Sequence, residues 1–243
     1  MFITSFYGYL KKPTPNLSID KDRNFKQRIL CIANCYATYL LLALSSFFIL
    51  KIIDTAILKY FYDFSILSQF EINNKKTLSK FGDYAIIIIP FVGPFIEEIL
   101  FRLPLNFRQT SIGLAVALIT YRFTGKHLFS FDPYEIYSYI RIGIALTVFM
   151  SVSFFFPLPW LEKIKESYFK WFFYLSAVLF ALVHITNLAP YNHSALFFYP
   201  LYTLPQFFMG LVIGYLRVRQ GFFSGWVLHA LINLPSALVY FFK

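Results

Sequence analysis

Long apolar runs recur along this chain of 243 residues, and they limit what it can fold into. Examples are Leu30–Ile53, 84–104 and 195–216, each close to the roughly 20 residues that a helix needs to cross a bilayer. Inside a bilayer the backbone must satisfy its own hydrogen bonds, which helices do within a single segment. The sequence therefore predicts an all-α, polytopic transmembrane helical bundle of seven or eight spans.

The composition supports a membrane protein and argues against a nucleic-acid-binding one. Hydrophobic residues make up 58% of the chain and charged residues only 14%, whereas a soluble domain is about 45–50% apolar and about 25% charged. The net charge is +10, but the basic residues lie at the ends of apolar runs, where they set orientation and meet anionic lipid. We expect a multi-pass protein of the inner (cytoplasmic) membrane. Its partner is expected to be the lipid bilayer, and it is not expected to bind nucleic acid.

The chain divides into a short basic segment and one membrane domain. Residues 1–28 are predicted to be polar, basic and cytoplasmic, and residues 29–243 to form a single transmembrane domain. Residues 55–70 contain Lys59 and Asp63, so they form either an interfacial helix or an eighth span. Residues 71–82 and 159–169 are predicted as polar loops. The remaining spans are expected at 84–104, 111–124, 136–158, 170–189, 195–216 and 222–242.

Two carboxylates and an arginine interrupt the apolar run that begins at Tyr84. A charge at membrane depth costs roughly 2.5–3.5 kcal/mol on insertion scales, so such residues indicate a functional site. Glu98 and Arg102 are four residues apart and therefore share a helix face, where they can pair. Glu97 is rotated about 100° from Glu98, which leaves it available for chemistry. Pro90 and Pro94 are expected to bend this helix.

Other polar residues lie inside later apolar runs. His184 and His229 occur on separate predicted spans, and Asn233 shares a helix face with His229. Phe180 lies one turn before His184, beside which it is expected to form a wall, and Asn187 either shares that face or ends the helix. By contrast, His127 and His193 fall in predicted loops and are read as ordinary. Cys31 and Cys35 are read as small packing residues of the first span.

A glutamate, two histidines and an asparagine in a low-dielectric interior can hydrolyse a peptide with an activated water. The carboxylate acts as general base, and the other side chains stabilise the oxyanion. No serine or cysteine accompanies them as a nucleophile. Two histidines and a carboxylate can also hold zinc. The chain has no HExxH pair, and each ligand would come from a different helix, but the sequence leaves zinc open.

Three spaced motifs together resemble one protein family. They are EExxxR at Glu97, Glu98 and Arg102, FxxxH at Phe180 and His184, and HxxxN at His229 and Asn233. In this order they resemble the CAAX protease and bacteriocin-processing (Abi, or type II CAAX prenyl endopeptidase) family of intramembrane proteases. The resemblance covers about residues 84–240. Ala181 departs from it, since a glycine is common there.

The resemblance implies a metal-independent glutamate protease without a cofactor. Its catalytic residues would be Glu97, His184, His229 and Asn233. Glu97 would activate water that His184 helps to hold, while His229 and Asn233 would form the oxyanion hole. Glu98 and Arg102 would be a structural pair, and Phe180 would support them. The motif helices would surround a central intramembrane cavity, and the substrate would be a membrane-associated peptide or protein.

Two other functions are compatible with the sequence. A non-catalytic family member could act as a bacteriocin-immunity or membrane binding protein, in which case Glu97→Ala would keep the biological effect. A small-solute transporter would also place charges at membrane depth. The absence of an internal sequence repeat argues against the transporter.

Overall fold

The computed structural model describes residues 2–15, 24–125 and 132–242, and this part contains helices and no strand. The predicted all-α class is confirmed, while His127 lies outside the described residues. The α-helices are α1 (Phe2–Lys11), α2 (Phe25–Ile53), α3 (Lys59–Tyr62), α4 (Ile66–Phe81), α5 (Ala85–Ile87), α6 (Gly93–Phe101), α7 (Gln109–Phe123), α8 (Ile136–Phe155), α9 (Leu158–Val183), α10 (Leu204–Gln220) and α11 (Phe222–Phe241). Shorter 3-10 and π-helical segments join them: η2 (Asp54–Leu58), η3 (Gly82–Tyr84), η4 (Ile88–Val92), η5 (Leu103–Asn106), η6 (His184–Leu188) and η7 (His193–Thr203).

Within the described residues, six helical stretches are long and apolar enough to cross a membrane, compared with the seven or eight predicted. Residues 55–70 add no span, because the chain turns at Asp63, which has a left-handed backbone (φ 46°). The predicted span at 111–124 forms α7, which has 15 residues. At 1.5 Å per residue it is about 22 Å long, less than the roughly 30 Å of a hydrocarbon core.

Two segments predicted as loops are helical. Residues 71–82 lie almost entirely within α4, whose first turn is capped by the Ser65 side chain. Residues 159–169 form the first part of α9, which extends the predicted span at 170–189 toward its N-terminus. Both segments contain charged side chains that a helix can leave exposed on one face, so polarity alone did not distinguish them from loops.

A buried carboxylate, that of Asp54, joins three elements at the end of α2. It is 1% exposed and accepts hydrogen bonds from the Ser65 hydroxyl (2.6 Å), the Leu67 N–H (3.2 Å) and the Tyr202 hydroxyl (3.1 Å). The turn after α3 is therefore fixed against α4 and η7 by one side chain.

Replacing Asp54 with alanine should destabilise the protein by about 2–4 kcal/mol, because buried donors left without an acceptor cost about 1–3 kcal/mol each. Thermal unfolding in detergent measures the effect. Asp83→Ala, at an exposed residue of η3, is the matched control. An equal loss of stability in the two variants would contradict the structural role of Asp54.

Helix α10 forms the centre of the bundle. It is buried continuously from Met209 to Val218 and packs against α2, α9 and α11. A Cβ added at Gly210 would lie 3.0 Å from the Ala177 Cα, and one at Gly214 would lie 2.9 Å from the Phe173 ring. These glycines let α9 approach α10 closely, as small residues do between membrane helices.

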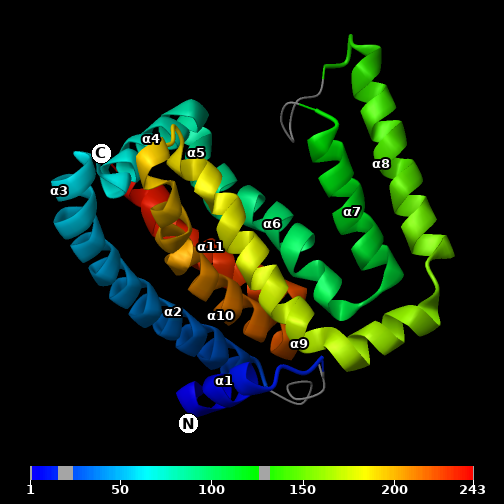
Figure 1. Cartoon of the computed structure of the whole chain (residues 1–243). Coiled ribbons are helices and arrows are strands. Elements are labelled where there is room, and N and C mark those ends of the chain that lie inside the picture. Colours follow the sequence, from blue (N-terminus) through cyan, green and yellow to red (C-terminus); the bar gives the residue numbers. More distant parts are fainter. Residues whose placement is uncertain (1, 16–23, 126–131, 243) are drawn as a thin grey trace.

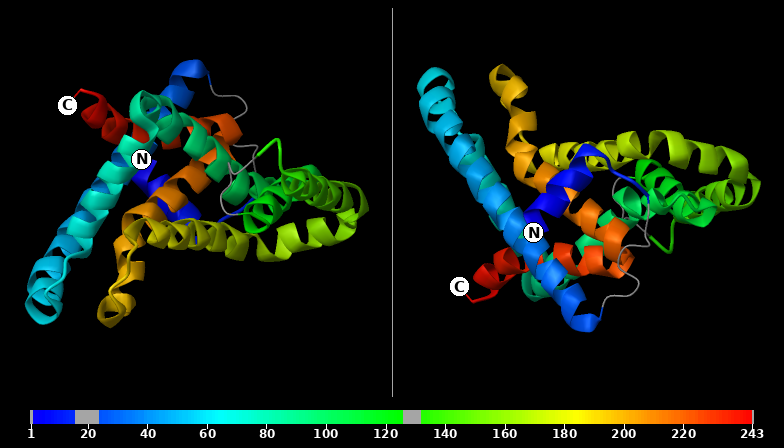
Figure 2. Two further views of the ribbon diagram at one scale, coloured as in Figure 1. Left: turned by 90° about the horizontal axis from the view of Figure 1, so that it is seen from above. Right: turned by 90° about the horizontal axis from the view of Figure 1, so that it is seen from below.

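The bundle has two ends and a lateral arm (Figures 1 and 2). One end, here called the basic end, comprises α1, η5, the start of α9 and the turn between α10 and α11, whereas α4 lies at the opposite end. Helix α1 packs on the core, because Phe6 is 5% exposed and its ring centre lies 5.2 Å from that of Tyr215. Helices α7 and α8 form a hairpin that extends to one side of the other helices.

Candidate active site

The two glutamates lie on a short helix that follows an irregular turn. A π-helical turn at Ile88–Val92 contains the buried Pro90, and α6 begins at Gly93 with Pro94 in its first turn. The irregular turn lies at the two prolines that were expected to bend this helix, since a proline removes a backbone N–H from the helical ladder. Glu97 and Glu98 then lie in the second half of α6, which ends at Phe101.

Glu98 is the buried anchor of the site. Its Oε1 lies 3.4 Å from Nη1 of Arg102 and 3.0 Å from Nδ1 of His229, and the side chains of all three residues are 0% exposed. The expected Glu98–Arg102 pair is therefore present. The hydrogen bond between Glu98 and His229 was not predicted, because it joins α6 to α11 and spacing within one helix carries no information about it.

The His229 ring lies between the two glutamates. Its Nε2 is 3.4 Å from Oε2 of Glu97, while its Nδ1 contacts Glu98 on the other side. The Glu97 side chain is 32% exposed, in contrast to the fully buried side chains of Glu98 and His229. The two carboxylates thus differ as expected: one is enclosed by Arg102 and His229, and the other is accessible.

The Phe180 ring packs against both histidines and the arginine. Its centre lies 3.7 Å from the Arg102 guanidinium, 4.6 Å from the His184 ring and 5.6 Å from the His229 ring. Phe180 is 0% exposed, and it forms the wall beside His184 that the sequence led us to expect. This one side chain brings α6, α9 and α11 together at the site.

His184 is held in one orientation at the end of α9. Helix α9 ends at Val183, so His184 begins the 3-10 segment η6 instead of lying inside the helix. Its Nδ1 lies 2.7 Å from the Phe180 carbonyl oxygen. A carbonyl only accepts, so Nδ1 carries the proton, and Nε2 of the neutral ring is an acceptor.

The two asparagines occupy different positions. Asn233 lies one turn beyond His229 on α11 and is partly buried, and within the described residues its side chain has no hydrogen bond to Glu97, His184 or His229. Asn187 is exposed, and its carbonyl oxygen accepts a hydrogen bond from the Asn73 side chain (2.8 Å). Asn187 therefore belongs to the end of the helix, the second of its two expected roles.

Two contacts that support the site were missed from the sequence. The Ser176 hydroxyl donates to the Phe101 carbonyl oxygen (2.6 Å), which ties α9 to the end of α6. A Cβ added at Gly225 would lie 3.5 Å from Oε2 of Glu98, so α11 passes close to this carboxylate. Both contacts connect segments far apart in the sequence, and the small size of Ser176 and Gly225 was the only available signal.

The described residues contain no group of three or more His, Cys, Asp or Glu side chains placed to hold a metal ion. Glu97 and His229 are adjacent, but Nδ1 of His184 is engaged by a backbone carbonyl. Metal independence stays a prediction. Cys31 and Cys35 are buried in the core that α2 forms with α10, in keeping with the packing role expected of them.

Comparison with known proteins agrees with this geometry. No curated protein and no solved structure matches the chain. The profile of the type II CAAX prenyl endopeptidase Rce1-like family matches residues 83–235, which is more than half of the chain. The matched region contains every motif residue of the site, from Glu97 on α6 to Asn233 on α11. The chain therefore belongs to the type II CAAX prenyl endopeptidase Rce1-like family.

Proposed function

We propose that this chain is an intramembrane endopeptidase that hydrolyses a peptide bond with a water activated by Glu97. Its family is one of membrane proteases, and six helices in the described part of the chain are long and apolar enough to cross a membrane, which supports a multi-pass membrane protein. One observation carries the proposed mechanism. Glu97 is accessible and faces Nε2 of His229, while the buried Glu98 holds the opposite nitrogen of the same ring.

The proposed reaction follows from these contacts. Glu97 takes a proton from water as its oxygen attacks the carbonyl carbon of the scissile bond. His184 accepts a hydrogen bond from that water through Nε2, because its Nδ1 is bound to the Phe180 carbonyl. When the tetrahedral intermediate collapses, the C–N bond breaks and the proton on Glu97 passes to the leaving amine.

The oxyanion of that intermediate needs hydrogen-bond donors. We assign this role to His229 through Nε2 and to Asn233 through its side-chain amide, since both lie on one face of α11. Loss of one such donor typically costs about 10²–10³ in rate. Glu98 accepts from Nδ1 of His229, which keeps Nε2 directed toward the reacting atoms. Nε2 can donate to the oxyanion when the His229 ring is doubly protonated, because a neutral ring has a single N–H.

The position of Glu97 also suggests the class of substrate. Glu97 lies inside the membrane-capable stretch Ile66–Phe101, so the scissile bond must reach a membrane-embedded carboxylate. We therefore propose a membrane-associated peptide or protein as substrate. The family's description is that of a CAAX prenyl endopeptidase. For this chain, the test therefore compares peptides with and without a prenyl group.

The test compares fluorogenic quenched peptides with and without a lipid anchor, prenylated or acylated, on protein reconstituted in nanodiscs. We expect cleavage of anchored peptides, unchanged by EDTA or 1,10-phenanthroline at concentrations that inactivate a zinc protease assayed in parallel. Activity that chelators remove and Zn²⁺ restores would contradict the metal-independent mechanism. Folded protein that binds anchored peptides without cleaving them would instead support the non-catalytic alternative.

A further inference from the structure

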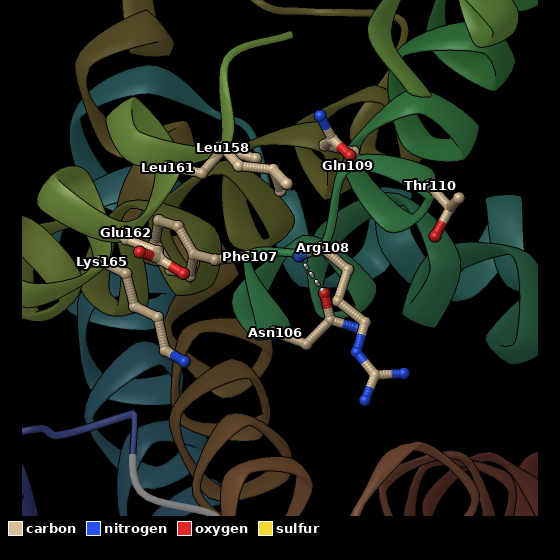
Figure 3. A pocket seen from close by; sticks show the side chains of 9 residues that line it. All are labelled: Asn106, Phe107, Arg108, Gln109, Thr110, Leu158, Leu161, Glu162 and Lys165. Carbon is tan, nitrogen blue, oxygen red and sulfur yellow. Dashed lines mark hydrogen bonds between the residues drawn. The ribbon is translucent and has the colours of Figure 1, made fainter. Parts of the chain in front are cut away.

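A cavity separate from the candidate active site opens at the basic end (Figure 3). It has a volume of about 380 Å³ and lies between the connection from η5 to α7 and the first turns of α9. This is within the roughly 300–1,000 Å³ of small-ligand sites. Its walls include Asn106, Arg108, Gln109, Leu158, Leu161 and Lys165, and none of the motif residues lines it.

The walls of this cavity are fixed by hydrogen bonds. Asn106 accepts from the Arg108 backbone N–H at 2.8 Å and donates to the Ser111 hydroxyl at 2.8 Å. The Gln109 side chain donates to the carbonyl oxygen of Phe156, which connects the start of α7 to the segment before α9. These hydrogen bonds hold the start of α7 next to the segment before α9, so the fold itself forms the cavity.

The cavity and its surroundings carry cations that form no ion pair among the described residues. Arg108 and Lys165 form no ion pair within the described residues, and Figure 3 shows their charged ends reaching toward the same side. A small adjoining cavity shares Asn106 and is lined by Arg217. Arg217 is 6% exposed, and its Nε has no hydrogen-bond partner among the described residues. An anion placed here meets positive charge from the η5–α7 connection, α9 and α10.

The exposed side chains near the cavity favour a position at the level of lipid headgroups. The first part of α9 runs across the basic end of the bundle (Figure 1). It exposes Leu158 (56%) and Trp160 (67%), and Trp171 further along α9 is 70% exposed. Exposed tryptophans on a membrane protein concentrate at the interface between headgroups and hydrocarbon. The cavity combines an apolar wall from Leu158 and Leu161 with a cationic side. It therefore suits a molecule that has an apolar part and an anionic group.

We propose that this cavity binds the headgroup of an anionic phospholipid, with its phosphate on Arg108 and Lys165. Glu162 also lines the cavity and would repel a second negative charge. Its carboxylate can instead accept a hydrogen bond from a headgroup hydroxyl. The site therefore fits a phosphoglycerol headgroup better than a bare phosphate monoester. Leu158 and Leu161 receive the first methylenes of the acyl chains.

The experiment titrates the full-length protein in detergent with dihexanoyl phosphatidylglycerol and follows tryptophan fluorescence and thermal unfolding. Dihexanoyl phosphatidylcholine, dihexanoyl phosphatidate and soluble glycerol phosphate are titrated in parallel. We expect phosphatidylglycerol to bind most tightly. Arg108→Gln and Lys165→Gln should each weaken that binding about fivefold, the value of one basic side chain near an anionic membrane surface. Lys163→Gln, an exposed residue of α9 that does not line the cavity, should leave it unchanged.

A further variant tests the headgroup preference. Glu162→Gln should reduce the difference in affinity between phosphatidylglycerol and phosphatidate, because the variant lacks the carboxylate that repels the second negative charge of phosphatidate. An equal effect of Lys163→Gln would overturn the proposal in favour of general surface attraction. Binding of glycerol phosphate as tight as that of the lipid would overturn it in favour of a soluble ligand. Phosphatidylglycerol binding no tighter than that of phosphatidylcholine would overturn it outright.

Discussion

Glu97→Gln should lower the rate of peptide cleavage by about 10²–10⁴, the contribution of a positioned general base. Glutamine has nearly the shape of glutamate, but it cannot take a proton from water. The side chain at this position is 32% exposed, and its contact with His229 can persist with the amide oxygen as the acceptor. We therefore expect the variant to fold. Initial rates of peptide cleavage per mole of folded protein measure the effect.

A matched variant separates loss of the base from loss of a charge. Glu71 is an exposed glutamate of α4, at the end of the bundle opposite the basic end, and Glu71→Gln should cleave at the rate of the unmodified protein. Thermal unfolding and gel filtration establish that both variants are folded. Wild-type rates in folded Glu97→Gln would rule out Glu97 as the base and favour a role in binding alone.

The sequence was most informative where one helix holds both members of a pair. The spacing of Glu98 and Arg102 predicted their contact, which is present at 3.4 Å. The apolar runs likewise predicted an all-α membrane bundle, because the length and hydropathy of a span can be read from a single segment of the sequence. Such arguments need no knowledge of which helices are neighbours.

Contacts between helices were beyond the same reasoning. Nothing in the spacing of α6 and α11 predicts that the His229 ring lies between Glu97 and Glu98. The position of Phe180 against Arg102 depends on the close approach of α9 and α10 at Gly210 and Gly214, together with the packing of α6 on α9. These features arise from tertiary packing.

The errors in the helix boundaries have a related cause. Residues 71–82 and 159–169 are polar enough to resemble loops, yet both are helical in α4 and α9. Helix α7 is apolar enough to resemble a span, yet it has 15 residues and pairs with α8 in the lateral hairpin. Hydropathy reports how much of a segment is apolar, whereas the partners of a helix decide where it begins and ends.

The second large effect concerns the buried ion pair. Arg102→Met should destabilise the protein by about 3–5 kcal/mol, because it leaves a buried carboxylate without its cation. Glu98 and Arg102 are both 0% exposed, and Arg102 also stacks on the Phe180 ring at 3.7 Å. Thermal unfolding in detergent reports the loss, with Arg28→Met, at an exposed arginine of α2, as the control for removing an arginine.

A double variant separates the stability of this pair from its effect on His229. Replacing both charges, in Glu98→Leu with Arg102→Met, should recover much of the lost stability, since apolar side chains of similar volume often substitute for a buried pair without cost. Cleavage should nevertheless stay about 10²-fold low, because Nδ1 of His229 has lost its acceptor and the ring can leave the reacting geometry. A stable and active double variant would show that the pair serves folding alone. A stable and inactive one would make Glu98 a positioning residue, which acts on the reaction through His229.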